Sequence, residues 1–186
     1  MTEWNASADM MLQISSSIVP IRSDLPLRRV LAEDFPQDCA NLPIEGGWGY
    51  TQPEAIVFLR EQFPPGMPPD FVQLEYHIAQ KIVYEELIIF RPEDYRFSGI
   101  DMKLTKQNLA GVGGKQYDHL EFSVTCWSDW HWNMLKKEWE DSDFGKSPNF
   151  DREQHLFKRN GSQVTYERML WFDISDVFDL RNGSLH

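Results

Sequence analysis

The chain has few cysteines and no long apolar run. Its two cysteines, Cys39 and Cys126, lie far apart and form no CxxC motif, so a disulfide framework or a zinc knuckle is not expected. The longest apolar run, Ala55–Leu59, has five residues, whereas a membrane span needs ~18 to 20. The N-terminal segment also lacks the basic start and apolar stretch of a secretory signal. These absences favour a cytoplasmic protein that binds no membrane.

The sequence also lacks the short motifs that mark common catalytic and cofactor sites. It contains no GxxxxGK[ST], GxGxxG, GxSxG or HExxH pattern and no EF-hand loop. The glycine-rich segment AGVGGK, residues 110–115, does not have the spacing of a phosphate-binding loop. We therefore expect no nucleotide, no metal and no other cofactor.

Basic residues are scarce, above all between residues 33 and 94. The chain holds 29 Asp and Glu against 18 Lys and Arg, a net charge of −11. Residues 33–94 contain 12 of the acids and only three of the bases, and so carry nine of the eleven net charges. An acidic surface repels nucleic-acid phosphates and anionic lipids but attracts basic proteins. The charge thus predicts no nucleic-acid partner and is compatible with a basic protein partner.

Apolar residues are plentiful enough for a folded core. They make up 41% of the 186 residues, and aromatic residues make up 13%. A chain of this length is expected to form one domain and to bury roughly 70% of its unfolded surface. We predict a single domain over residues 1–186, in which residues 1–20 form a loosely packed polar arm. The proline-rich residues 64–69 predict a stiff surface loop.

Alternating apolar residues predict an antiparallel strand pair. The first strand carries Ile100, Met102 and Leu104, and the second carries Leu120, Phe122, Val124 and Cys126 on one face. The glycine-rich segment between them predicts the reversal. Asn160-Gly161 indicates a second hairpin, which would join FKR to the strand SQVTYERMLWF.

Helical spacing predicts the remaining elements. We expect a short helix around residues 27–31, one from Asp70 to about Glu86, and one over residues 128–141. The segment 70–86 can also be interpreted as two strands, because Val72, Leu74, Tyr76 and Ile78 alternate, but the helix is favoured. The segment LIIF that follows is expected to continue as a strand. The fold class is α+β, an antiparallel sheet with two or three helices packed on one face.

Four of the seven tryptophans fall within or beside the helix predicted over residues 128–141. At 100° per residue, Trp132, Leu135 and Trp139 share one face of this helix. The opposite side carries Trp130 and Met134, with Trp127 directly before the helix. If a sheet buries one face, the other needs a cover: the N-terminal arm through Trp4, Met10, Met11 and Leu12, or a protein partner. Exposed Trp and Met clusters are typical of protein interfaces.

Histidines and cysteines provide weak candidates for chemistry. His119 and Glu121 are expected on the outer face of one strand, where they can act as base and orienter or as two metal ligands. No third ligand can be predicted, so a solvated strand face is the favoured interpretation. Cys126 and His131 can form a thiol and base, but Cys126 falls on the inward strand face, where a thiol is inert.

Adjacent carboxylates occur at Glu85-Glu86 and at Glu93-Asp94. Catalytic carboxylate pairs converge on one space, whereas neighbours along a helix or strand diverge. A solvated acidic face is therefore the favoured interpretation of these four acids, a partner-binding face is the alternative, and no catalytic residue is predicted among them. Together with the Trp side of the later helix they make the candidate binding residues: Glu85, Glu86, Glu93, Asp94, Trp127, Trp130 and Met134.

The sequence predicts a small acidic binding protein of bacterial type without catalysis. Immunity proteins that neutralise nuclease toxins resemble it in size, acidity and aromatic content, and this resemblance of composition implies a basic protein partner. Two alternatives stay open. One is a hydrolase-like enzyme with a dispersed site that uses His119, Glu121 or His77. The other is a subunit of a homo-oligomer with the Trp-rich helix between copies.

Overall fold

The computed structural model describes residues 21–63 and 70–182. The predicted N-terminal arm, including Trp4, Met10, Met11 and Leu12, and the predicted proline-rich loop lie outside these residues. Within the part described, no helix is long and apolar enough to cross a membrane. The class is α+β with a mostly antiparallel sheet, as the sequence predicts.

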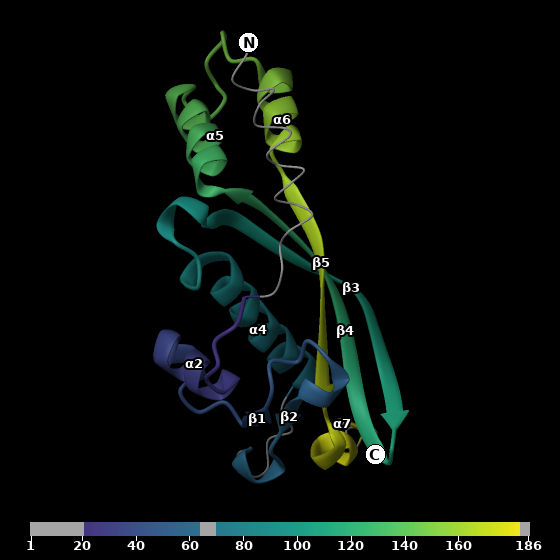
Figure 1. The fold of residues 1–186 in the computed structure, drawn as a ribbon. Helices are drawn as coiled ribbons and strands as arrows, with labels where there is room; N and C mark the ends of the chain where they lie inside the picture. Colours follow the sequence, from purple (N-terminus) through teal and green to yellow (C-terminus); the bar gives the residue numbers. More distant parts are fainter. Residues whose placement is uncertain (1–20, 64–69, 183–186) are drawn as a thin grey trace. The chain divides into compact units, whose positions relative to one another are not determined.

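The alternating segments form the two longest strands, β3 (Phe97–Val112) and β4 (Lys115–Ser128) (Figure 1). Alternate residues of β4 from Leu120 to Cys126 are almost completely buried, because successive side chains of a strand point to opposite faces. Gly113 and Gly114 turn the chain with positive φ angles, which glycine adopts without steric cost. The predicted antiparallel pair and its glycine-rich reversal are confirmed.

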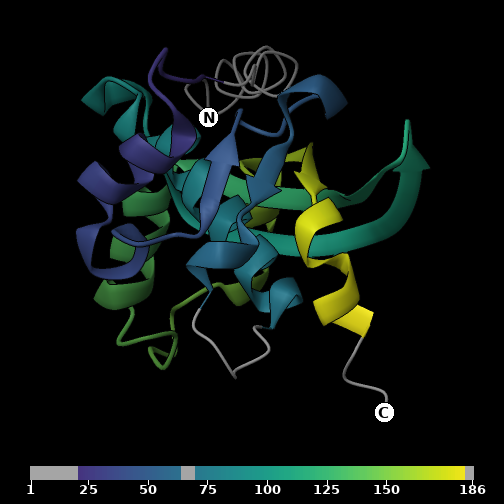
Figure 2. The same ribbon diagram turned by 90° about the horizontal axis from the view of Figure 1, so that it is seen from below.

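The sheet has the order β1-β2-β5-β4-β3 and is mixed at one place. Strand β1 (Ile44–Gly46) pairs antiparallel with β2 (Ile56–Phe58), and Figure 2 shows these two short blue strands side by side. Strand β2 pairs parallel with β5 (Val164–Asp173), with Ile56 opposite Phe172. Phe58 stacks on Phe172 at 5.9 Å between ring centroids and joins the core beside this ladder.

Helix α4 (Phe71–Tyr84) settles the ambiguity of residues 70–86 in favour of a helix. Asp70 caps it by accepting the backbone N–H of Gln73 at 3.0 Å. The strand expected for LIIF is wrong: the chain continues as a π-helical turn, η3 (Glu85–Ile89). Inward residues of α4 recur every three or four positions, whereas the two-strand interpretation would bury every second one.

The hairpin predicted at Asn160-Gly161 is also wrong. These residues end helix α6 (Arg152–Gly161), and β5 begins three residues later. Asp151 caps α6 through the backbone N–H of Gln154 at 2.9 Å. A capped helix satisfies its first N–H groups locally, and FKR has no strand-like alternation to compete with it.

The other elements are short except for α5 (Asp129–Asp141), which confirms the helix predicted over residues 128–141. The predicted helix near residues 27–31 is α2 (Leu27–Asp34). The remaining elements are α3 (Pro36–Cys39), η1 (Gln52–Glu54), η2 (Arg60–Gln62), η4 (Glu93–Tyr95), η5 (Ser175–Val177) and α7 (Phe178–Asn182).

The described residues group into two compact units. The first unit contains residues 86–103 and 123–167, and the second contains residues 21–63, 70–85, 104–122 and 168–182. The boundaries fall inside β3, β4 and β5. The first unit carries α5, α6 and η4; the second carries α2, α4 and the β1-β2 ladder. Single-domain organisation over residues 1–186 stays a prediction.

Candidate functional site

The first unit places η4 next to the start of α5. The backbone N–H of Asp129 donates to the carbonyl of Arg96 at 3.0 Å, and the hydroxyl of Ser98 donates to the Asp129 carboxylate at 2.7 Å. Asp129 also stands in the first turn of α5, where a negative charge is favoured by the helix dipole. These contacts fix the first turn of α5 against the segment that follows η4.

Two exposed aromatic side chains lie at this junction. Tyr95 is 69% exposed and Trp130 is 62% exposed. Tyr95 precedes Arg96 and Trp130 follows Asp129, the two residues that the backbone hydrogen bond joins. Trp and Tyr dominate the binding energy of protein interfaces, so two exposed aromatic side chains at one junction are candidates for contact with a partner.

Glu93 and Asp94 add two exposed carboxylates to the same element, η4. Neither forms an ion pair with any residue that the structure describes. Other exposed carboxylates, such as Glu33 and Asp179, hold an arginine at 2.7 to 2.8 Å. We call Glu93, Asp94, Tyr95 and Trp130 the η4–α5 surface.

Two arginines flank the carboxylates in sequence but are turned to the backbone. The Nε of Arg91 donates to the carbonyl of Glu86 at 2.7 Å, and its guanidinium lies 5.1 Å from the ring centre of Phe97. Burial lowers the pKa of Arg91 from its ordinary value. The Nε of Arg96 donates to the carbonyl of Arg91 at 3.4 Å. The acids of η4 are exposed, whereas both arginines are partly buried.

The structure corrects the expected solvent exposure of Glu85 and Glu86. Both are fully buried, because η3 continues α4 and carries them inward. Burial, and secondarily the negative charge of Asp34, raise the pKa of Glu85 to about 8. As placed, these two side chains cannot contact a partner, so they leave the candidate surface.

Trp127 is another correction, because only 4% of it is exposed. Its indole Nε1 donates to the carbonyl of Arg159 at 2.9 Å, and its ring lies 5.4 Å from that of Trp132. Met134 is half-buried and lies beside Lys137 and Ser142 in a shallow groove. Of the seven predicted binding residues, Glu93, Asp94 and Trp130 are therefore exposed near one another.

His119 and Glu121 do lie close together, in the second unit. The Nδ1 of His119 is 4.0 Å from the Glu121 carboxylate, but Lys106 binds that carboxylate at 3.1 Å. The imidazole stacks on Trp171 with 4.2 Å between ring centres. Among the described residues, no group of three or more His, Cys, Asp or Glu side chains is arranged to hold a metal ion.

Both cysteines are buried and free. Burial raises the pKa of Cys126 to about 12, although Arg91 opposes the shift, and this confirms the predicted inward thiol. His131 instead places its Nδ1 2.8 Å from the Ser128 hydroxyl, the same oxygen that caps α5. Sequence reasoning missed the contact of Cys39 with His77, whose Nε2 lies 3.8 Å from the sulfur.

No short sequence motif predicts the Cys39–His77 pair, because its two residues are 38 positions apart in the chain. It has the composition of a thiol nucleophile and its base. However, burial raises the pKa of Cys39, and this outweighs the opposing effect of Lys81. The neutral thiol is a poor nucleophile, so the pair does not make an active site as it stands.

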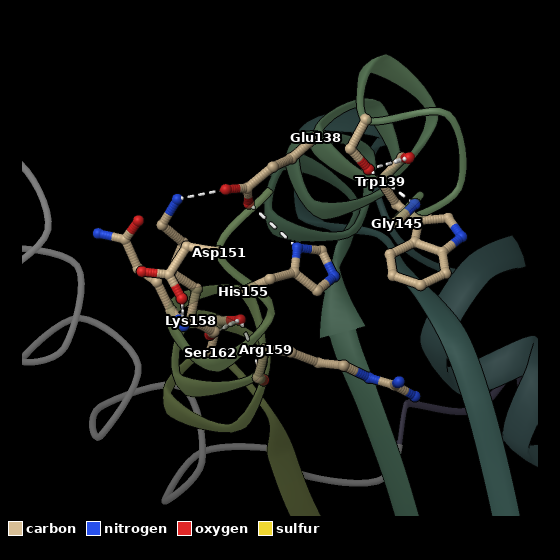
Figure 3. Close-up of polar contacts among 10 residues, drawn as sticks. Glu138, Trp139, Gly145, Asp151, His155, Lys158, Arg159 and Ser162 are labelled. Carbon is tan, nitrogen blue, oxygen red and sulfur yellow. Dashed lines mark hydrogen bonds and ion pairs between the residues drawn. The ribbon is translucent and has the colours of Figure 1, made fainter. Parts of the chain in front are cut away.

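A polar network joins α5 to α6 in the first unit (Figure 3). Glu138 binds the Nζ of Lys158 at 2.6 Å with one carboxylate oxygen and the Nδ1 of His155 at 3.2 Å with the other. Burial alone would raise the pKa of Glu138, but the hydrogen bonds from Lys158 and His155 lower it below its ordinary value. The network keeps Glu138 ionised and fixes the two helices to each other.

No protein-family model matches the chain, and neither curated proteins nor solved structures include a significant match.

Proposed function

We propose that this chain is a binding protein without catalysis, and that a basic protein docks on its η4–α5 surface. The observation that carries the proposal is the exposure of Trp130 and Tyr95 beside Glu93 and Asp94, two carboxylates that pair with no cation among the residues described. An aromatic anchor buries a large apolar area, and unpaired acids attract a complementary surface.

Charge and anchor have different roles in this proposal. The net charge of −11 would speed encounter with a basic protein over about one Debye length, ~10 Å in 0.1 M salt. Trp130 would supply most of the affinity, since truncation of a central Trp typically costs at least ~2 kcal/mol. An acidic inhibitor that covers a cationic binding face would have this combination of features.

A cytoplasmic location and a toxin-neutralising role of the immunity type belong to the same proposal. Two free, buried cysteines support a reducing compartment. The hydrolase-like alternative has less support, because His119 is stacked on Trp171 and Glu121 already holds Lys106. A homo-oligomer built on Trp130 is the main competing use of the surface.

The test is affinity capture followed by binding kinetics. The full chain is used as bait in a lysate of its source cells at about 50 mM salt, and the recovered proteins are identified and purified. We expect a basic protein whose association rate falls at least about tenfold between about 50 and about 300 mM salt. Light scattering on the bait alone measures self-association.

A double variant tests the surface itself. Glu93→Gln with Asp94→Asn should slow association with the captured protein, whereas Glu140→Gln with Asp141→Asn should not. The control removes the same charge from exposed carboxylates at the far end of α5. Recovery of no basic protein, equal loss in both double variants, or a stable dimer that Trp130→Ala dissociates would each refute the proposal.

A further inference from the structure

A half-open pocket lies between helices α5 and α6 within the first unit. They are joined by residues 142–151 and run antiparallel, side by side (Figure 1). Each helix contributes residues at positions i, i+3, i+4 and i+7, which form one face of a helix. On α5 these are Trp132, Leu135, Lys136 and Trp139, and on α6 they are Arg152, His155, Leu156 and Arg159.

The walls of this pocket are mainly apolar and aromatic. Trp132, Leu135 and Trp139 face Leu156 of α6 and Phe150 of the connecting segment. The cavity volume is about 430 Å³, within the usual range of ligand pockets of ~300 to 1,000 Å³. At ~30 Å³ for each water-sized group, it has room for roughly 14 non-hydrogen atoms.

All fixed charges in the lining are positive. Lys136, Arg152 and Arg159 line the pocket, and no carboxylate does, although the whole chain carries −11. The nearest network carboxylate, Glu138, holds Lys158 and His155, and Figure 3 shows the Arg159 side chain extending away from it. The pocket therefore reverses the sign of charge that dominates the protein.

Arg159 is the best placed of the three cations to receive an anion. Its guanidinium lies 5.4 Å from the ring centre of Trp127 and forms no ion pair or side-chain hydrogen bond within the part of the chain described. Arg152 instead donates from Nε and Nη2 to the carbonyl of Gly145 at 3.3 and 2.9 Å. The Nζ of Lys136 forms an ion pair with the Glu140 carboxylate at 3.8 Å. A planar guanidinium on an aromatic ring presents its N–H edge for two parallel bonds to a carboxylate.

We propose that this pocket binds an amphiphilic anion, a medium-chain carboxylate whose tail lies between α5 and α6 and whose head group binds Arg159. Dodecanoate, which has twelve carbons and two oxygens and so about 14 non-hydrogen atoms, matches the volume. The site is separate from the η4–α5 surface, so either proposal can fail without the other.

The sign of the ligand's charge provides a direct test of the proposal. Nonspecific binding to a protein of net charge −11 would favour a cationic amphiphile over an anionic one. A preference for the anion therefore has to come from the local cations of the pocket. Dodecanoate and dodecylammonium both have twelve carbons and carry opposite charges, and so measure this preference directly.

The experiment is calorimetric titration of the full chain with each of the two amphiphiles, below the concentration at which they form micelles. We expect dodecanoate to bind at least about tenfold more tightly than dodecylammonium. Arg159→Gln should weaken dodecanoate binding by about tenfold or more. Lys137→Gln removes the same charge from a residue of α5 that does not line this pocket, and should change it by less than about twofold.

A second variant fills the pocket without touching its charges. Leu156 is 51% exposed, so Leu156→Trp can add volume without disturbing the core, and should abolish binding of dodecanoate while far-ultraviolet circular dichroism stays unchanged. The proposal is overturned if dodecylammonium binds as well as dodecanoate, if Arg159→Gln has no more effect than Lys137→Gln, or if Leu156→Trp binds normally. The proposal is also overturned if the full chain does not bind dodecanoate. This holds equally if the pocket is found to be occupied by residues 1–20 or by a second copy of the chain.

Discussion

Glu85 predicts an unusual dependence of stability on pH. The side chain is fully buried, and burial, followed by the negative charge of Asp34, raises its pKa from 4.5 to about 8. Between these values the folded chain holds a proton that the unfolded chain has released. The contribution of Glu85 to stability is therefore complete below about pH 4.5 and is lost as the pH rises through about 8.

The perturbation is Glu85→Gln, which keeps the shape of the neutral acid and cannot ionise. Each pH unit between the two pKa values costs the wild type about 1.4 kcal/mol in free energy of unfolding. From about pH 5.5 to about pH 7.5 the variant should therefore gain about 3 kcal/mol relative to the wild type. His131, whose pKa burial lowers, has the opposite pH dependence but affects both proteins equally.

The assay is urea denaturation at several pH values, followed by tryptophan fluorescence. Glu33→Gln is the control, because it removes the same charge from a hydrated side chain that pairs with Arg29 on the surface. Its difference from the wild type should stay constant with pH. A constant difference for Glu85→Gln as well, or a wild type that gains on the variant as the pH rises, would refute the assignment of a buried, protonated carboxyl.

Three further outcomes concern packing, capping and thiols. Gly99→Ala should destabilise the fold by about 2 kcal/mol more than Gly113→Ala in urea denaturation. Both glycines have positive φ angles, but only a Cβ at Gly99 would meet the Trp132 ring. Equal losses in the two variants would contradict this packing. Ser128→Ala should cost about 1 kcal/mol through loss of the α5 cap, and no loss would show that the cap is unimportant. Both cysteines are buried, so a thiol reagent should label them in denaturant and not in the native chain at neutral pH; rapid native labelling would contradict their burial.

Local patterns predicted those elements whose residues repeat regularly. The alternation of β4, the Asp70 cap of α4 and the Ser128 cap of α5 are all visible in consecutive residues. Asn160-Gly161 misled because the pair ends a helix as readily as it turns a hairpin, and the Asp151 cap that decides the matter lies nine residues earlier.

The site could be predicted only in part. The reasons are the choice between helical and strand periodicity and the long separation in sequence of residues that meet in the fold. Helical phase groups Trp127 with Trp130, but Trp127 belongs to β4 and follows the period of a strand. The burial of Glu85 depends on how the turn after α4 packs, which adjacent charges do not reveal. The approach of Tyr95 to the start of α5 needs the β3–β4 hairpin, which brings together residues more than thirty positions apart.

The central claim is that Trp130 anchors a basic protein. Its most direct test compares Trp130→Ala with Phe157→Ala in equilibrium binding to the captured partner, since Phe157 is an equally prominent aromatic, 71% exposed, on α6. We predict a dissociation constant at least about 30-fold weaker for Trp130→Ala, as expected for loss of ~2 kcal/mol, and a change below about twofold for Phe157→Ala. Wild-type affinity in Trp130→Ala would contradict the claim.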